Sequence, residues 1–150
     1  MAGDSELVAL YSTRILALAA DMPLCGRLES PDGTGTRRAP LCGSTVTVDL
    51  NLDDGIIRDF RQNVRACALG QAAASIVGRA VIGSSRTDIA RAREALARML
   101  ADGGPPPAPP FDGLGILTVA RDHRNRHGSI LLALDATLTA FDDAEARQAG

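Results

Sequence analysis

Apolar residues recur at helical spacing near the start of the chain, where residues 4–22 read DSELVALYSTRILALAADM. The apolar members of this pattern are Leu7, Leu10, Tyr11, Ile15 and Leu18. Asp4 or Ser5 is expected to cap the helix, because both side chains accept hydrogen bonds from its first N–H groups. Residues 30–40 are rich in Pro, Gly and Thr, and this composition predicts a loop or a wide turn.

The pattern then changes to strict alternation. Apolar residues alternate with Thr, Asp and Asn from position 46 to position 52: the apolar ones are Val46, Val48, Leu50 and Leu52. This alternation predicts a strand with one face on a core. Asp53-Asp54-Gly55 is a hairpin turn signal, since Gly adopts the positive φ that such turns require. Residues 56–64 are therefore expected to return as the second strand of a hairpin.

Three further segments predict helices: residues 68–82, 84–100 and 129–148. Gly83 stands where the first of them should end, and Ser85 or Thr87 where the second should be capped. The residues expected to face inward are Ile89, Ala92, Leu96 and Met99, followed by Ile130, Leu131, Leu134, Leu138 and Phe141. Residues 101–110, ADGGPPPAPP, predict an extended connector between the last two helices.

Strands early in the chain and helices late in it predict an α+β fold, in which a small antiparallel sheet is covered on one face by helices. The length of 150 residues is usual for one domain. The chain has no Trp and a single Tyr, so the core should be aliphatic.

Charge and chain termini narrow the function classes. The formal net charge of −2 argues against a general nucleic-acid-binding protein. The start of the chain does not read as a secretory signal, and no apolar run reaches the ~18 residues that a membrane helix needs. We therefore expect a cytoplasmic protein that lies outside the membrane, with its three cysteines reduced.

The cysteines carry the candidate chemistry. Cys25 and Cys42 each stand in the tetrapeptide PLCG, and Cys67 lies between the second strand and the helix after it. A hairpin brings the start of its first strand close to the end of its second, which predicts that Cys42 and Cys67 lie at the same edge. N–H groups at the helix start should lower the pKa of the Cys67 thiol. His123 and His127 are the only histidines, and His127 is placed to complete a metal site with the two cysteines. Cysteines are also common as small buried apolar residues, and loop histidines as solvated side chains, so these residues alone do not establish a metal site.

The segment PLCGSTVTVDLNLDDGIIRDFRQNVRACALGQAAASI, residues 40–76, resembles the NifU/IscU-type scaffolds that assemble iron–sulfur clusters. The opening LYSTRILALAADMPLCGRL and the closing RHGSILLALDA are also similar to that family. The resemblance extends over about residues 7–141 as a single domain, with residues 1–6 and 142–150 as terminal segments. It implies a protein that receives sulfur from a cysteine desulfurase and iron from a donor. Such a protein holds a nascent [2Fe–2S] cluster and passes it to apo-protein acceptors, with a chaperone as a further partner.

The resemblance also implies site residues. Cys42 matches the first ligand cysteine of the family, Cys67 the second, and His127 the histidine that precedes the third cysteine. Two positions depart from the pattern: Ser44 stands where the family has an aspartate, and Gly128 where it has its third cysteine. Cys25 falls where the family has no ligand, and it ranks with His123 as a less favoured candidate.

Three hypotheses remain open. In the first, the chain binds a cluster, iron or zinc through Cys42, Cys67 and His127, or as a homodimer that pools four thiolates. In the second, it docks a desulfurase or a chaperone without holding a metal. In the third, it relays sulfur through Cys67, whose lowered pKa favours nucleophilic attack. None of the three is an enzyme in the usual sense, and the chain has no phosphate loop or HExxH motif.

Overall fold

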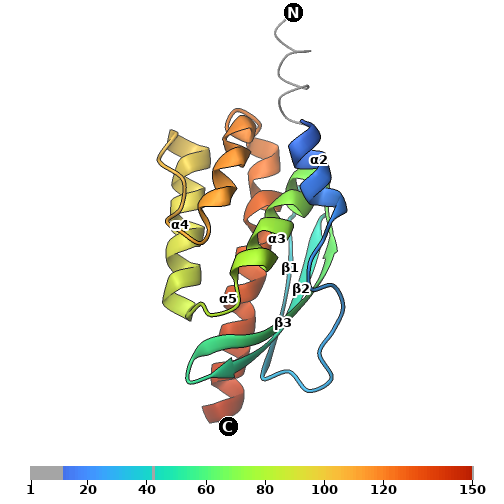
Figure 1. Ribbon diagram of the computed structural model, residues 1–150, viewed down its shortest axis with the longest axis vertical. Coiled ribbons are helices and arrows are strands. Elements are labelled where there is room, and N and C mark those ends of the chain that lie inside the picture. Colours follow the sequence, from blue (N-terminus) through green and yellow to red (C-terminus); the bar gives the residue numbers. More distant parts are fainter. Residues whose placement is uncertain (1–11, 42, 150) are drawn as a thin grey trace, which may run out of the picture.

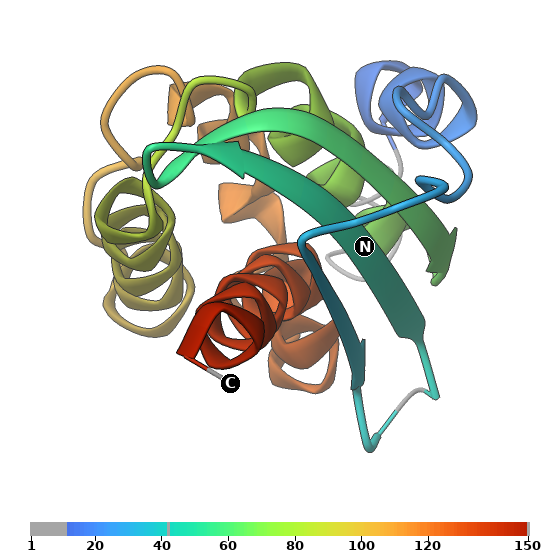
Figure 2. The same cartoon turned by 90° about the horizontal axis from the view of Figure 1, so that it is seen from below.

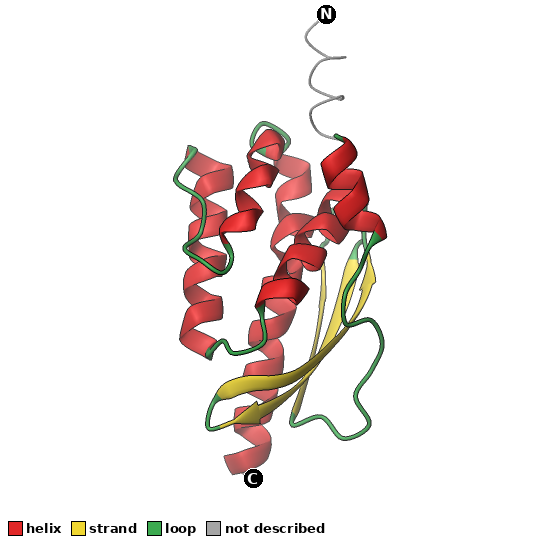
Figure 3. Cartoon of the chain, viewed as in Figure 1, coloured by secondary structure: helices red, strands yellow, loops and turns green. Residues whose placement is uncertain are grey.

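A three-stranded antiparallel sheet forms one layer of the molecule and helices form the other (Figure 1). The structure is a computed structural model that describes residues 12–41 and 43–149. In chain order its elements are α2 (Thr13–Ala20), β1 (Gly33–Arg38), β2 (Thr45–Asp53), β3 (Ile56–Arg65), α3 (Ala68–Ala80), α4 (Arg86–Asp102), the 3₁₀ helices η1 (Asp112–Ala120) and η2 (Arg124–Arg126), and α5 (His127–Ala149). All described helices lie on one side of the sheet (Figures 2 and 3), and on its other side the segment before β1 covers Asp49 of β2. The predicted α+β class is confirmed.

The predicted hairpin is present as β2 and β3. Asp54 and Gly55 form its two-residue turn, with φ of 53° and 80°, as a type I′ turn requires. At the opposite end of the hairpin, Thr45 pairs with Arg65. The start of β2 and the end of β3 are therefore neighbours, and both lead into segments that carry the candidate chemistry.

The prediction of a loop at residues 30–40 is wrong, because Gly33–Arg38 forms strand β1 at the edge of the sheet. Gly33 and Gly35 face α5 so closely that a side chain at either position would overlap the helix backbone. The close approach of β1 and α5 is visible in Figure 2. The two glycines allow this contact because they have no side chain. For the same reason they add no apolar position to the sequence pattern, and the strand was not predicted.

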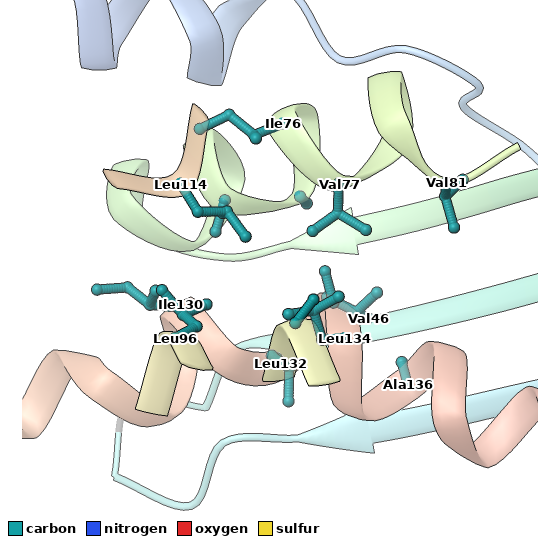
Figure 4. Close-up of a cluster of buried hydrophobic side chains, with 14 of the residues drawn as sticks. Val46, Ile76, Val77, Val81, Leu96, Leu114, Ile130, Leu132, Leu134 and Ala136 are labelled. Atoms are coloured by element: carbon teal, nitrogen blue, oxygen red, sulfur yellow. The ribbon is translucent and has the colours of Figure 1, made fainter. Parts of the chain in front are cut away.

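Helix α5 is the central element of the core, since it contacts β1, β2, α3 and α4. Figure 4 shows its Ile130, Leu132 and Leu134 among buried aliphatic side chains of the sheet and the other helices. The inward residues predicted for α4 are all buried: Ile89, Ala92, Leu96 and Met99. Of those predicted for α5, Ile130, Leu134 and Phe141 are buried, while Leu131 and Leu138 are partly buried against the core.

The helix ends follow the expected capping rules with one shift. Ser85 caps α4, and its side chain and that of Asp88 form a reciprocal capping box. Helix α3 ends at Ala80 and is capped by Val81, so the prediction that Gly83 caps it is wrong. The Gly83 N–H instead donates to the carbonyl of Ile57, which ties this loop to β3. The caps predicted at residues 4 and 5 lie outside the described residues.

Candidate functional site

Cys67 lies where β3 passes into α3. It is the N-cap residue of that helix, with extended φ and ψ of −66° and 170°, and its side chain is half-buried. Because the N-cap precedes the first helical turn, the unpaired N–H groups of that turn face its sulfur. This position makes Cys67 the best-placed thiol in the described part of the chain for thiolate chemistry.

The pKa of the Cys67 thiol is lowered from its ordinary value by its surroundings. Burial, the largest single influence, would by itself raise this pKa, because it disfavours the charged thiolate. That effect is outweighed by four polar groups near the sulfur: the Gly70 N–H, the Ser129 hydroxyl, the Leu69 N–H and the Arg126 side chain. A larger fraction of Cys67 is therefore thiolate near neutral pH, and the thiolate is the form that attacks sulfur and bonds metals.

Two buried serines connect Cys67 to the start of β2. The Ser129 hydroxyl, near the start of α5, lies 3.5 Å from the Cys67 sulfur and donates to Ser44 Oγ at 3.1 Å. Both serines are at least 96% buried, at 2% and 4% exposure. Gly70 leaves the space for Ser129, since a side-chain carbon on Gly70 would overlap the Ser129 oxygen. The beginnings of β2, α3 and α5 thus meet at one point.

Cys42 lies outside the described residues, so its predicted place beside Cys67 stays a prediction. The turn that contains it is closed by two hydrogen bonds, from the Ala39 N–H to the Ser44 carbonyl at 2.8 Å and from the Gly43 N–H to the Ala39 carbonyl at 2.9 Å. Ser44, two residues after Cys42, is one of the two buried serines next to Cys67. The neighbouring Leu41 is 82% exposed.

His127 begins α5, and its imidazole is held by the backbone. Its Nε2 lies 3.0 Å from the carbonyl oxygens of both Ala120 and Arg121. Carbonyls only accept, so Nε2 carries the proton and the neutral ring keeps its free lone pair on Nδ1. Any metal bond from His127 must therefore use Nδ1. His123, the N-cap residue of η2, is half-buried.

Within residues 12–41 and 43–149, no three His, Cys, Asp or Glu side chains gather closely enough to hold a metal ion. Gly128 contributes no ligand, yet its surroundings leave room for one. A side-chain carbon added there would meet only the Ala39 Cβ, at an ordinary contact distance of 3.8 Å. The described donor set at this point of the fold is one stabilised thiol, and a second sulfur ligand depends on Cys42.

Cys25 lies elsewhere on the sheet. It forms an isolated parallel bridge with Gln62 of β3, and its exposed thiol donates to the Met22 carbonyl at 3.3 Å. Gln62 precedes the end of β3 at Arg65 by three residues, which is about 10 Å of strand. The two PLCG segments therefore have different structural settings, and only the second adjoins the serine pair.

Ser129 and Arg126 were not among the predicted site residues, although both stabilise the Cys67 thiolate. Their contacts join segments about sixty residues apart, so no local pattern marks them. The adjacent letters RHGS offered one signal, because Ser129 directly follows the position of the lost family cysteine. No helix in the described ranges is long and apolar enough to cross a membrane.

Comparison with known proteins gives consistent results. The sequence model of the NifU-like N terminal domain family matches residues 10–109. A crystal structure of a NifU-like protein (N-terminal) from Brucella abortus is 40% identical, with a TM-score of 0.90, and the match covers 95% of this chain and 99% of that one.

Two further relatives are more distant. The iron–sulfur cluster assembly scaffold protein IscU of Thermotoga maritima is 28% identical over 80 residues, or 53% of this chain, and the chain spans only 56% of that protein's length. A putative iron–sulfur cluster assembly scaffold protein for the SUF system from Fervidobacterium islandicum is 18% identical and has a TM-score of 0.80. That match covers 89% of this chain and 98% of the other, and it shows a shared fold.

Proposed function

This chain belongs to the NifU-like N-terminal domain family, and from that premise we propose that it is an iron–sulfur cluster assembly scaffold whose cargo is bonded by Cys67 and Cys42. The observation that carries the proposal is the environment of Cys67: a half-buried thiol whose thiolate is stabilised by the start of α3, Ser129 and Arg126. A thiolate is the ligand that iron in such clusters prefers. In this proposal Cys42 is the second ligand and His127 is the third, through Nδ1.

The partners follow from the same proposal. Sulfur comes from a cysteine desulfurase, iron from a donor protein, and the cluster leaves to apo-protein acceptors with the help of a chaperone. Zinc would compete for the same thiolates, because it also bonds cysteine sulfur and imidazole nitrogen. Ser44 and Gly128 give the cargo fewer ligands than the family pattern has, so we expect it to be held weakly and released readily.

A sulfur relay is the second candidate, favoured by the fact that the described stabilising groups all act on the single thiol of Cys67. The Cys67 thiolate attacks the outer sulfur of a donor's persulfide, and a new S–S bond forms on Cys67. The S–S bond within the donor breaks, and the donor cysteine leaves as a thiolate. The transfer conserves atoms and electrons, so it requires no external oxidant or reductant.

Anaerobic reconstitution with iron and sulfide tests the first candidate. We expect the wild type to gain iron, acid-labile sulfide and a visible cluster absorption, and Cys42→Ser and Cys67→Ser to lose all three. Cys25→Ser is the matched control and should behave like the wild type, because Cys25 lies about 10 Å of strand away from the end of β3. A wild type that binds no iron, or a Cys67→Ser variant that retains its cluster, would contradict the scaffold.

Two further measurements separate the candidates. Gly128→Cys should slow the loss of a reconstituted cluster, because the added Cβ meets only Ala39 at an ordinary contact distance and the variant adds a third thiolate. Gly128→Ser controls for the change in size. If the wild type takes up no iron but gains the mass of one sulfur when mixed with a desulfurase and cysteine, and Cys67→Ser does not, the relay is the better account.

A further inference from the structure

Arginine side chains gather at the end of the sheet next to Cys67. Arg38 and Arg65 pair in register with Thr45 from its two sides, so the three side chains point to the same sheet face. Val46 is buried under the helices, which places Thr45 and its two neighbours on the sheet face away from the helices. An Nη of Arg38 lies 3.7 Å from where a side-chain carbon on Gly43 would be, next to the turn that contains Cys42.

Arg126 completes this cluster, which we call the arginine rim: Arg38, Arg65 and Arg126. Arg126 interacts with the Cys67 sulfur itself. The rim therefore comes from three separate segments, namely the end of β1, the end of β3 and the residues just before α5. Their convergence is produced by the fold, because no single stretch of sequence contains all of them.

The rim carries positive charge that the described structure does not neutralise. Seven ion pairs join arginines to carboxylates in the described ranges, and none includes a rim arginine. The segments that supply the rim are also free of acidic residues: residues 33–48, 60–87 and 123–134 contain no Asp or Glu. The chain as a whole has a formal charge of −2, so this is a local excess on an otherwise acidic protein.

An exposed apolar side chain accompanies the rim. Leu41, 82% exposed, is the most exposed of the large hydrophobic residues in the described part of the chain. It lies in the turn between Arg38 and Ser44, directly before Cys42. A large apolar side chain beside unpaired arginines is a composition found where proteins bind one another, because burial of the apolar group excludes water from the charged contacts.

The charges decide which occupant this surface fits. A second copy of the chain would bring two arginine rims together, which is repulsive in a desolvated interface. Nucleic acid is disfavoured by the net negative charge of the chain and by the burial of its three phenylalanines, which leaves none of them exposed for a base to stack on. An acidic protein surface would neutralise the rim and bury Leu41 at the same time.

We propose that the arginine rim and Leu41 dock an acidic surface of the protein that transfers sulfur to Cys67, an inference that rests on the function proposed above. The docked donor would present its persulfide to the half-buried Cys67 sulfur. The outer sulfur moves to Cys67, and the donor cysteine leaves as a thiolate stabilised by nearby rim charge. The rim thus selects the donor and also favours the leaving group of the transfer.

The test compares two double charge reversals. In Arg38→Glu/Arg65→Glu the rim is reversed, and Arg126 is left unchanged because its loss would alter the thiolate directly. The matched control, Arg58→Glu/Arg91→Glu, makes the same total change of charge at exposed positions. Arg58 is seven residues from Arg65, about 23 Å along β3, and Arg91 lies beside Ala80 at the far end of α3 from Cys67.

Binding to the cysteine desulfurase of the same genome is measured by titration calorimetry at low and moderate salt, after circular dichroism has shown that each variant is folded. We expect the rim reversal to raise the Kd about 30-fold or more at low salt, Leu41→Ala to raise it about tenfold, and the control to change it less than about threefold. Added salt should raise the Kd of the wild type towards the Kd of the milder variant Arg38→Gln/Arg65→Gln.

Equal binding by the rim reversal and the control would overturn the inference, and so would a wild type that does not bind the desulfurase. Chemical reconstitution with iron and sulfide distinguishes these failures from failure of the proposed function, because small reagents need no docking surface. The rim reversal should reconstitute as fully as the wild type. A rim reversal that cannot be reconstituted would assign the arginines to the thiol site itself and overturn docking.

Discussion

The two ends of the sheet use their charged residues differently. Along the middle and far part of β2, Asp49 is fully buried and accepts hydrogen bonds from Arg27, Thr34 and the Leu28 N–H. At the near end, next to Cys67, the arginine rim pairs with no carboxylate of the described chain. The first arrangement fastens the segment before β1 to the sheet, whereas the second joins no two segments.

The two ends of the sheet also differ in how tightly they are packed. The glycines of β1 let α5 approach the strand backbone, and Asp143 of α5 accepts a hydrogen bond from the Thr34 N–H at 2.9 Å. The Cys67 end instead has an exposed leucine and a half-buried thiol. We infer that the part of the sheet away from Cys67 contributes most of the stability of the fold. The end next to Cys67 contains an exposed leucine and unpaired arginines that selection for stability alone would not favour.

The largest expected effect is at Gly35. In Gly35→Ala the added carbon would overlap the Ala136 carbonyl and lie 2.5 Å from the Ala140 nitrogen, so strand and helix must separate. We expect a loss of about 3 kcal/mol or more in the free energy of unfolding, measured by urea denaturation. The control is Gly128→Ala at the start of the same helix, which should leave stability unchanged or raise it by up to about 1 kcal/mol. Equal urea midpoints for the two variants would contradict the tight β1–α5 contact.

The parts of the fold that could be predicted from the sequence are those with apolar periodicity. The hairpin and helices α3, α4 and α5 follow directly from side-chain patterns, because burial of those side chains forms them. Strand β1 could not be found in this way, since its inward positions are glycines whose role depends on a helix a hundred residues later. Helix η1 was also missed, although its buried Leu114, Leu117 and Ala120 recur every three residues, the period of a 3₁₀ helix.

The next effect in size is at Asp49. Asp49→Asn removes the charge that Arg27 meets at 2.7 Å and weakens the acceptor of the Thr34 hydroxyl and the Leu28 N–H. We expect a loss of about 2–3 kcal/mol at pH 7, because hydrogen bonds to a buried charged group are among the stronger ones. Urea denaturation measures this loss, and Asp53→Asn at the exposed end of β2 is the control, with little expected change.

The same variant predicts a pH dependence. Burial would raise the pKa of Asp49, but hydrogen bonds from Arg27, Thr34 and Leu28 and the charge of Arg27 lower it overall. The folded protein then binds fewer protons at this carboxyl than the unfolded chain does, so its contribution is complete above the unfolded pKa of about 3.9 and decreases as the pH falls below that value. The stability difference between wild type and Asp49→Asn should therefore shrink as the pH falls below about 4. A difference independent of pH would show that the carboxylate charge is not the cause.

The candidate site could be predicted only in part. The place of Cys67 at a strand–helix junction follows from local patterns, and a helix start is known to favour a thiolate. Ser129 and Arg126 could not be predicted, because they reach Cys67 only after α5 packs against α3. The open position at Gly128 is likewise a property of the packed structure, since the sequence indicates a missing ligand but not the space around it.

The smallest effects test whether the arginine rim has a structural role. Arg93 Nε meets Asp135 Oδ1 at 2.8 Å, and Asp135 is only 18% exposed, so Arg93→Gln should cost up to about 1 kcal/mol. Arg38→Gln and Arg65→Gln break no ion pair of the described chain and reduce repulsion between neighbouring guanidinium groups. They should leave the free energy of unfolding within about 0.5 kcal/mol of the wild type, or raise it slightly. If neutralising the rim cost as much stability as Arg93→Gln, the rim would be part of the scaffold's own packing, and the contrast between the two ends would disappear. If it costs nothing while sulfur transfer slows, the positive charge at Cys67 is retained for a partner.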